Sequence, residues 1–218
     1  MSKETYAKMK NLLEKIVQKL EKEESYLNHL DANIGDGDHG RTIATSFRKT
    51  LEELSPEKDL DIGAFLKKVG GSIAFSGGAA TGPLFGTAFI EAGKALEGKE
   101  ALSLENWAKA LESAEEGIKK RGNAKVGEKT MLDAIHPAVQ SLKKSFSCSE
   151  SLNEALEKVR QSAQKGMEST KNLISKRGRS SRLGERTKGH IDPGAASSYF
   201  ILETVIEACR KGKEKQRA

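Results

Sequence analysis

The chain has 218 residues, a formal net charge of +6 and a sequence pI of about 9.2. This length fits one domain, which buries roughly 70% of the surface that its unfolded chain exposes. Aromatic residues make up only 5% of the chain and both signs of charge are interspersed, so the basic excess does not indicate nucleic-acid binding. No apolar stretch approaches the ~20 residues of a membrane span, no apolar signal core begins the chain, and the two cysteines lie outside every motif. We therefore expect a cytoplasmic protein with no membrane segment.

The first half of the chain carries apolar residues at helical spacing. This spacing predicts a helix over about residues 4–30, then an acidic loop, then a second helix with Phe47 on its apolar face. A third helix is expected to begin near Asp61. A loop of small residues at 76–82 leads into a fourth helix, which has Pro83 in its first turn.

The second half predicts further helices with recognisable starts. Ser103 is expected to cap a fifth helix, and a sixth begins near Thr130. Ser151 and Glu154 form the capping-box pattern of a seventh, and an eighth follows Pro193.

Strand patterns are absent, whereas alanine, leucine, lysine and glutamate are abundant. We therefore predict an all-α fold, with a single domain over residues 1–218. The expected architecture is a bundle of about eight helices whose glycine-rich loops gather at one end. Residues 210–218 are expected to form a basic, frayed tail.

Three carboxylates lie within eight residues, between two predicted helices. Asp31, Asp36 and Asp38 are spaced by Gly35 and Gly37, which let the backbone fold tightly enough for the carboxylate oxygens to converge. Unpaired carboxylates about 4 Å apart would repel one another by ~4 kcal/mol at an effective dielectric of about 20, and a divalent cation turns that repulsion into attraction. Magnesium, which prefers oxygen ligands and often completes its shell with phosphates, is the first expectation. The alternative is an acidic loop that only caps the following helix.

Two familiar patterns do not fit this loop. The spacing Gly35-x-Gly37-x-x-Gly40 satisfies the dinucleotide-binding fingerprint, but that motif follows a strand and here a helix precedes it. A calcium loop that starts at Asp36 would need an oxygen ligand at its fifth position and a glutamate at its twelfth, where the chain has Gly40 and Phe47. A nucleotide would therefore be bound by another type of loop.

Several later segments could hold phosphate or could be plain turns. The small residues at 76–82 offer free amides at a helix amino terminus, where anions bind well, but they could also form only a tight turn. Segment 127–131 could border a ligand or simply begin a helix. The basic run 176–188 contains glycines and no aromatics, which favours a shaped loop that reaches phosphate. The turn at 190–194 could be no more than a helix cap by Asp192.

Four short motifs in a fixed order give the chain a resemblance to a known family. They are Asp-Gly-Asp-His-Gly at 36–40, Gly-Pro-Leu-Phe-Gly at 82–86, Gly-Glu-Lys-Thr-Met at 127–131, and an arginine-rich segment with Asp-Pro-Gly-Ala at 178–195. Over nearly the whole chain they resemble the nucleotide-binding L subunit of dihydroxyacetone kinase. The resemblance implies an antiparallel, barrel-like bundle of eight helices that holds ADP or ATP at one end over two magnesium ions.

The resemblance also implies roles for individual residues. Asp31, Asp36 and Asp38 match the family's magnesium ligands, and Arg179 matches a catalytic residue that neutralises charge on the phosphates. The residues that match nucleotide-binding positions are His39, Gly40, Arg41, Thr42, Ala80, Thr81, Gly122, Met131, Arg179, Asp192, Pro193 and Gly194.

The family's activity supplies the expected function. In the free-standing form, a histidine-phosphorylated M-type subunit of the sugar phosphotransferase system rephosphorylates bound ADP, and the phosphoryl group then passes to dihydroxyacetone on a separate K subunit. We therefore expect an enzyme subunit that is active only with its partners, while a homodimer is a further arrangement to be tested.

Two alternatives remain open. The chain departs from the family pattern at Thr42 and Ile43 and near Arg182, which leaves open an ATP-dependent kinase for another ketose such as erythrulose. From a different class, the chain could be a non-catalytic nucleotide-binding regulatory module.

Overall fold

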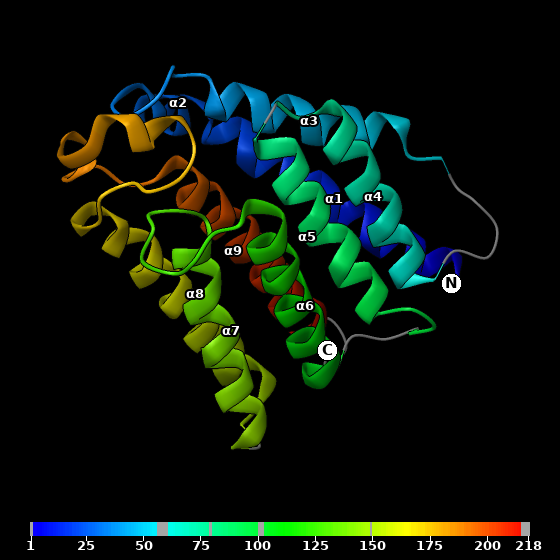
Figure 1. Cartoon of the computed structure of the whole chain (residues 1–218). Coiled ribbons are helices and arrows are strands. Elements are labelled where there is room, and N and C mark those ends of the chain that lie inside the picture. Colours follow the sequence, from blue (N-terminus) through cyan, green and yellow to red (C-terminus); the bar gives the residue numbers. More distant parts are fainter. Residues whose placement is uncertain (1, 56–60, 79, 100–102, 149, 215–218) are drawn as a thin grey trace.

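The structure is a computed structural model that describes residues 2–55, 61–78, 80–99, 103–148 and 150–214. Within these ranges every regular element is a helix (Figure 1), which confirms the predicted all-α fold. In chain order the elements are α1 (Lys3–Lys22), α2 (Glu24–Ala32), α3 (His39–Glu53), α4 (Ile62–Ser76), α5 (Thr81–Ala95), α6 (Leu104–Gly122), α7 (Leu132–Ser147), α8 (Leu152–Ser169), the 3-10 helices η1 (Thr170–Asn172) and η2 (Arg179–Thr187), and α9 (Pro193–Glu214). None of the described helices is both long and apolar enough to cross a bilayer.

Side-chain caps begin several helices where the sequence predicts them. The Asp61 carboxylate caps α4 by accepting a backbone N–H at 2.6 Å. Ser103 caps α6, and Ser151 and Glu154 form the reciprocal capping box of α8. Pro193 is the first residue of α9, where its missing N–H leaves no helical hydrogen bond unmade.

The helix predicted over residues 4–30 is two helices. Glu23 separates α1 from α2 because its backbone, at φ −93° and ψ 3°, lies outside helical values. Neither glycine nor proline marks this position. Because α2 contacts both α3 and α9, tertiary packing sets its direction, and the sequence carries no local signal for it.

The carboxyl-terminal helix extends into the segment predicted to be a basic, frayed tail. Helix α9 continues to Glu214, and the fraying expected of residues 210–218 stays a prediction. The Arg210 guanidinium pairs with the Glu157 carboxylate of α8 at 2.8 Å, which ties this part of α9 to its neighbour. Residues 215–218 of the predicted tail lie outside the described residues.

The chain runs up and down through the bundle, so alternate connections meet at one end. The connections that share the functional end (Figure 1) are 33–38, 77–80 (in which Ala79 lies outside the described residues), 123–131 and 170–192. The last of these contains η2, and an ion pair between Arg179 and Asp36 joins it to the loop after α2. The carboxyl-terminal ends of α3, α5 and α7 lie at the other end (Figure 1). Short connections between antiparallel neighbours produce this alternation.

The core fills the space between the helices with aliphatic and aromatic side chains. Phe47 of α3, Leu132 of α7 and Ala196 of α9 are all 0% exposed. Burying a side chain as large as that of Phe47 contributes roughly 2–3 kcal/mol. A separate apolar cavity of about 160 Å³ lies among α1, α5, α6 and α9, which is consistent with the barrel-like arrangement.

Helices α4 and α5 pack along a glycine seam, in which Gly63 and Gly70 of α4, and Gly77 directly after it, face Gly93, Gly86 and Gly82 of α5. A Cβ atom on Gly70 would lie 2.6 Å from the carbonyl oxygen of Gly86 and 2.8 Å from the backbone nitrogen of Ile90. Only hydrogen fits in that space. The backbones of the two helices are therefore in direct contact, and this contact holds the turn between them at the functional end.

We expect Gly70→Ala to lower the free energy of unfolding by about 1–3 kcal/mol, because the new methyl group must push α5 away from α4. The neighbouring Gly71 has no atom within 4 Å of a Cβ position. Gly71→Ala is therefore the matched control, and it should stabilise the protein by about 0.5–1 kcal/mol through helix propensity. Urea unfolding of both variants measures the difference. Equal changes in the free energy of unfolding would refute the close backbone contact at Gly70.

Candidate functional site

The connections at the functional end enclose an open cavity of about 370 Å³. Its walls come from all four connections, so residues far apart in the sequence face one space. The residues that line it are Asp31, Ile34, Gly35, Asp36, Asp38, His39, Thr42, Gly78, Ala80, Thr81, Leu84, Phe85, Lys129, Thr130, Met131, Arg177, Gly178, Arg179, Ser180, Asp192, Pro193 and Gly194.

Three carboxylates converge on one side of this cavity. Asp31, Asp36 and Asp38 each offer an oxygen, and these oxygens all lie within 4.8 Å of one another. The backbone orients the first of them, because Oδ2 of Asp31 accepts the N–H groups of Gly37 at 2.9 Å and Asp38 at 3.0 Å. An all-oxygen donor set of this kind, open to the cavity, fits a hard divalent cation such as magnesium.

Arg179 is the cation closest to this cluster. One of its guanidinium nitrogens forms an ion pair with the Asp36 carboxylate, and the side chains are 73% and 48% exposed. An ion pair this exposed contributes little to stability. The pair therefore leaves Arg179 available to an anionic ligand in the cavity.

His39 begins α3 directly after the acidic loop. Its Nε2 lies 3.0 Å from the hydroxyl oxygen of Ser197 on α9. Burial lowers the pKa of His39 to about 4, so its ring is neutral at pH 7. His39 therefore joins α3 to α9 and adds no positive charge to the site.

Asp192 lies buried where α9 begins. Its Oδ2 accepts the Ala195 N–H at 2.8 Å, and its own N–H donates to the Thr170 hydroxyl at 3.0 Å. Burial raises the pKa of Asp192 to about 7, and the nearby carboxylates of Asp133 and Asp31 act in the same direction. The turn of Asp192, Pro193 and Gly194 is thus fixed from both sides.

Lys129 also lines the cavity, and the sequence did not single it out. Its side chain is 1% exposed, and its ammonium donates to the carbonyl oxygens of Thr170, at 2.6 Å, and of His190. Burial lowers the pKa of Lys129, and Asp192 and Asp133 oppose that shift. One side chain therefore joins the α6–α7 connection to both ends of the α8–α9 connection.

Asp133 shapes the loop that presents Lys129. Its carboxylate accepts the N–H of Gly127 at 2.5 Å and of Thr130 at 2.7 Å, so the loop folds around it. Within this loop Lys129 has a positive φ of 61°, which is rare for a residue with a side chain. The Gly-Glu-Lys-Thr-Met motif at 127–131 was the signal in the sequence, but it gave no indication of where the lysine points.

Most of the predicted site residues face the cavity. The three aspartates, His39, Thr42, Ala80, Thr81, Met131, Arg179, Asp192, Pro193 and Gly194 all line it. Three predicted residues do not. Their proposed contacts with a nucleotide stay predictions.

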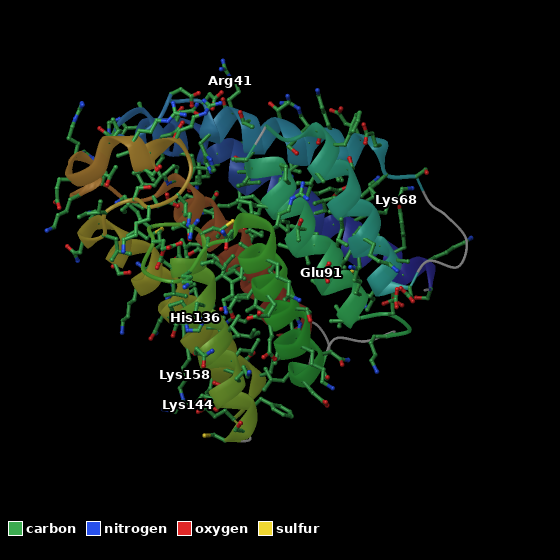
Figure 2. All side chains as sticks on the ribbon, in the orientation of Figure 1. Arg41, Lys68, Glu91, His136, Lys144 and Lys158 are labelled. Carbon is green, nitrogen blue, oxygen red and sulfur yellow. The ribbon has the colours of Figure 1, made fainter. Side chains whose placement is uncertain are left out.

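Each of these three residues has another place in the structure. Gly40 packs against the backbone of Glu24, which leaves no room for a side chain. Arg41 is exposed, and Figure 2 shows its side chain pointing away from the outer face of α3. Gly122 ends α6, where an added Cβ would lie 3.2 Å from Leu84, a residue of the cavity wall.

Comparison with protein families places residues 33–207 in the DAK2 domain. The chain belongs to the DAK2 domain family. Its relatives include two proteins named ADP-binding subunit DhaL of a PEP-dependent dihydroxyacetone kinase. The protein from Escherichia coli is 40% identical over 87% of this chain and 90% of its own length. The one from Listeria innocua, the second such kinase of that organism, is 36% identical over 88% of this chain and 89% of its own.

A solved structure shares the fold of this DAK2 domain. The dihydroxyacetone kinase of C. freundii, in complex with AMP-PNP and Mg²⁺, matches with a TM-score of 0.65 and 26% identity. The match covers 91% of this chain and 33% of that chain. The DAK2 domain thus corresponds to about a third of the longer kinase.

We expect Lys129→Met to lower the free energy of unfolding of the DAK2 domain by about 1–3 kcal/mol, because two buried carbonyl groups lose their donor. Amide hydrogen exchange should become faster at residues 190–195. The exposed Lys125 in the same loop is the control, since Lys125→Met should change stability by less than about 0.5 kcal/mol. Unchanged exchange at 190–195 in Lys129→Met would contradict the role of this ammonium.

Asp192 should make stability depend on pH. Because its pKa is about 7 in the folded protein and about 4 in the unfolded chain, the folded state binds the extra proton between those values. Its contribution is fully present below pH ~4 and is lost as pH rises through ~7. Asp192→Asn keeps the cap and does not titrate. Between pH 4 and 8 its free energy of unfolding should therefore fall by about 2–4 kcal/mol less than that of the wild type. Urea unfolding of both proteins in metal-free buffer from pH 4 to 8 tests this, and parallel curves would refute it.

Proposed function

We propose that this DAK2 domain is the ADP-binding phosphotransferase subunit of a PEP-dependent dihydroxyacetone kinase. It relays a phosphoryl group, through nucleotide bound with magnesium, to dihydroxyacetone held on a separate K subunit. The observation that carries the proposal is the convergence of Asp31, Asp36 and Asp38 in a cavity that also contains Arg179. An acidic loop that served only as a cap would not need a cavity in front of it. Moreover, the side chain of Asp38, the N-cap residue of α3, accepts no hydrogen bond from the start of that helix.

The relatives support the same function. Those named as ADP-binding subunits match this chain along nearly their whole length, which favours dihydroxyacetone over erythrulose as the sugar and a kinase subunit over a regulatory module. The related C. freundii kinase has been solved with a nucleotide analogue and Mg²⁺, and this supports the choice of metal.

Each part of the cavity has a place in the proposed complex. Asp31, Asp36 and Asp38 would hold magnesium, with two ions as the family resemblance implies. The amino terminus of α5, at Ala80 and Thr81, would receive a phosphate through free backbone N–H groups and the helix dipole. When bound, the metal would neutralise charge on the phosphates and the nucleotide would carry the transferred group.

The protein's own contribution is position and charge. Phosphoryl transfer needs little covalent chemistry from the protein and depends on alignment and electrostatic stabilisation. Arg179 would turn from Asp36 toward the phosphates once a cation occupies the carboxylates. His39, Lys129 and Asp192 do not act on the phosphoryl group. They fix the walls of the cavity, so that little reorganisation is needed on binding.

The proposed relay needs two partners. A histidine-phosphorylated M-type subunit would return ADP to ATP, and the K subunit would present the sugar hydroxyl. The cavity is open toward solvent, which suits access by both in turn. The domain would work in the cytoplasm, and its oligomeric state is an additional point for experiment.

Calorimetry of ADP binding tests this function. We expect one ADP to bind per chain in the presence of Mg²⁺, and Asp36→Asn to weaken that binding at least tenfold, or about 1.4 kcal/mol. The purified chain alone should not phosphorylate dihydroxyacetone at enzymic rates, whereas the chain with K and M subunits and a PEP-driven donor should.

Asp61→Asn is the matched control, because it makes the same chemical change at the opposite end of the bundle, where Asp61 caps α4. It should leave ADP affinity unchanged. Magnesium-independent binding that is equal in wild type and Asp36→Asn would overturn the metal assignment. Rapid sugar phosphorylation by the chain alone would overturn the proposal that partner subunits are required.

A further inference from the structure

The positive charge of the chain is concentrated beside the cavity. Residues 171–190 contain seven basic side chains and one acidic one, Glu185. The net charge of this segment therefore equals the +6 of the entire chain, and the remaining residues carry as many acidic as basic side chains. A uniformly solvated surface would not concentrate its charge in this way.

Five of these cations point into solvent and form the basic face, defined as Lys171, Lys176, Arg182, Arg186 and Lys188. All five are exposed, and none has an ion pair with any residue that the structure describes. The other two cations of the segment have partners, because Arg177 pairs with Glu128 at 2.6 Å and Arg179 with Asp36.

The backbone under the basic face is held firmly by its own hydrogen bonds. The Ser175 N–H donates to the Thr187 hydroxyl at 2.9 Å, and the hydroxyl oxygens of Ser175 and Ser180 are 2.6 Å apart. Thr187 in turn donates to the Gly184 carbonyl oxygen at 2.7 Å. The short polar side chains therefore bond within the segment, and only the long cationic ones are left for another molecule.

The basic face also adjoins the route to the phosphates. Gly178, Arg179 and Ser180 line the cavity, and the rest of η2, which kinks at Gly184, follows them directly along the chain. A protein that brings a hydroxyl group to a phosphate in this cavity must cover the mouth and therefore contact η2. A rigid, charged rim of this kind speeds docking and fixes the orientation of a partner of opposite charge.

We propose that the basic face docks an acidic surface of the protein that holds the sugar acceptor. This inference rests on the function proposed above and adds the surface through which that function is reached. The basic face acts by attracting the charge of the partner and not by contacting the nucleotide, because none of its five side chains lines the cavity.

The test uses charge reversal on the full chain. The variant Arg182→Glu/Arg186→Glu/Lys188→Glu should bind the purified dihydroxyacetone-binding subunit at least tenfold more weakly at low ionic strength, with a smaller loss at high salt. In the coupled assay, the KM for that subunit should rise by a similar factor. The kcat at saturating subunit should stay within about twofold, because the phosphate site is intact.

The matched control is Lys3→Glu/Lys49→Glu/Lys144→Glu, which makes the same change in net charge on exposed residues elsewhere. Lys144 lies near the far tip of α7 (Figure 2). This control should weaken docking less than threefold. Equal losses in both variants would overturn the proposal, because net charge alone would then explain the effect.

Two further measurements keep the outcome clear. Magnesium-dependent ADP binding should be the same in wild type and both variants, and wild-type turnover with partners tests the proposed function separately. If the glutamate variant does not fold, Arg182→Gln/Arg186→Gln/Lys188→Gln replaces it, with an expected loss of at least threefold. Unchanged docking, or weaker docking of the phosphohistidine donor alone, would refute the assignment.

Discussion

The mutual repulsion of three aspartates is the constraint on which the site depends. Asp31, Asp36 and Asp38 are held within 4.8 Å of one another, although each like-charged pair is unfavourable in the absence of a cation. The fold maintains this arrangement with backbone N–H groups that bind Asp31 and with Arg179, which partly neutralises Asp36. The protein thus carries a local electrostatic cost that a bound cation would remove, and the remaining loops supply the space for the group that such a cation would hold.

The rest of the site is built by side chains that fasten one connection to another. His39 joins α3 to α9, Lys129 joins the α6–α7 connection to the α8–α9 connection, and Arg177 joins the latter back to Glu128. Because the bundle alternates in direction, all of these connections already lie at one end. A few polar contacts are then sufficient to fix the cavity walls. The buried ones among them, such as those of Lys129, matter most because their partners have no water to replace them.

The sequence predicts what depends on neighbours along the chain. The acidic loop, the caps at Asp61 and Ser103 and the start of α9 at Pro193 are all local, so spacing alone locates them. The break at Glu23 depends on packing between distant segments. The 3-10 geometry of η2 is held by hydrogen bonds within residues 175–187, which no periodic pattern in the sequence marks.

Lys129 shows the same limit within the site. Its two acceptors are 41 and 61 residues away along the chain, so no window of sequence could reveal them. The position of Arg41 could not be foreseen either, because a motif gives the order of residues but not the direction in which each side chain leaves the helix.

The glycine seam between α4 and α5 has a mechanical consequence. Where two helices touch through their backbones, no side-chain rotamer can adjust to absorb a small displacement. Helices α4 and α5 must therefore move together as one rigid unit, with the Ala80–Thr81 turn at its end. A shift introduced at the distant end of this unit, near Ile62 or Ala95, would reach the turn undiminished, whereas a shift in the other helices would be damped by the pliable side chains between them.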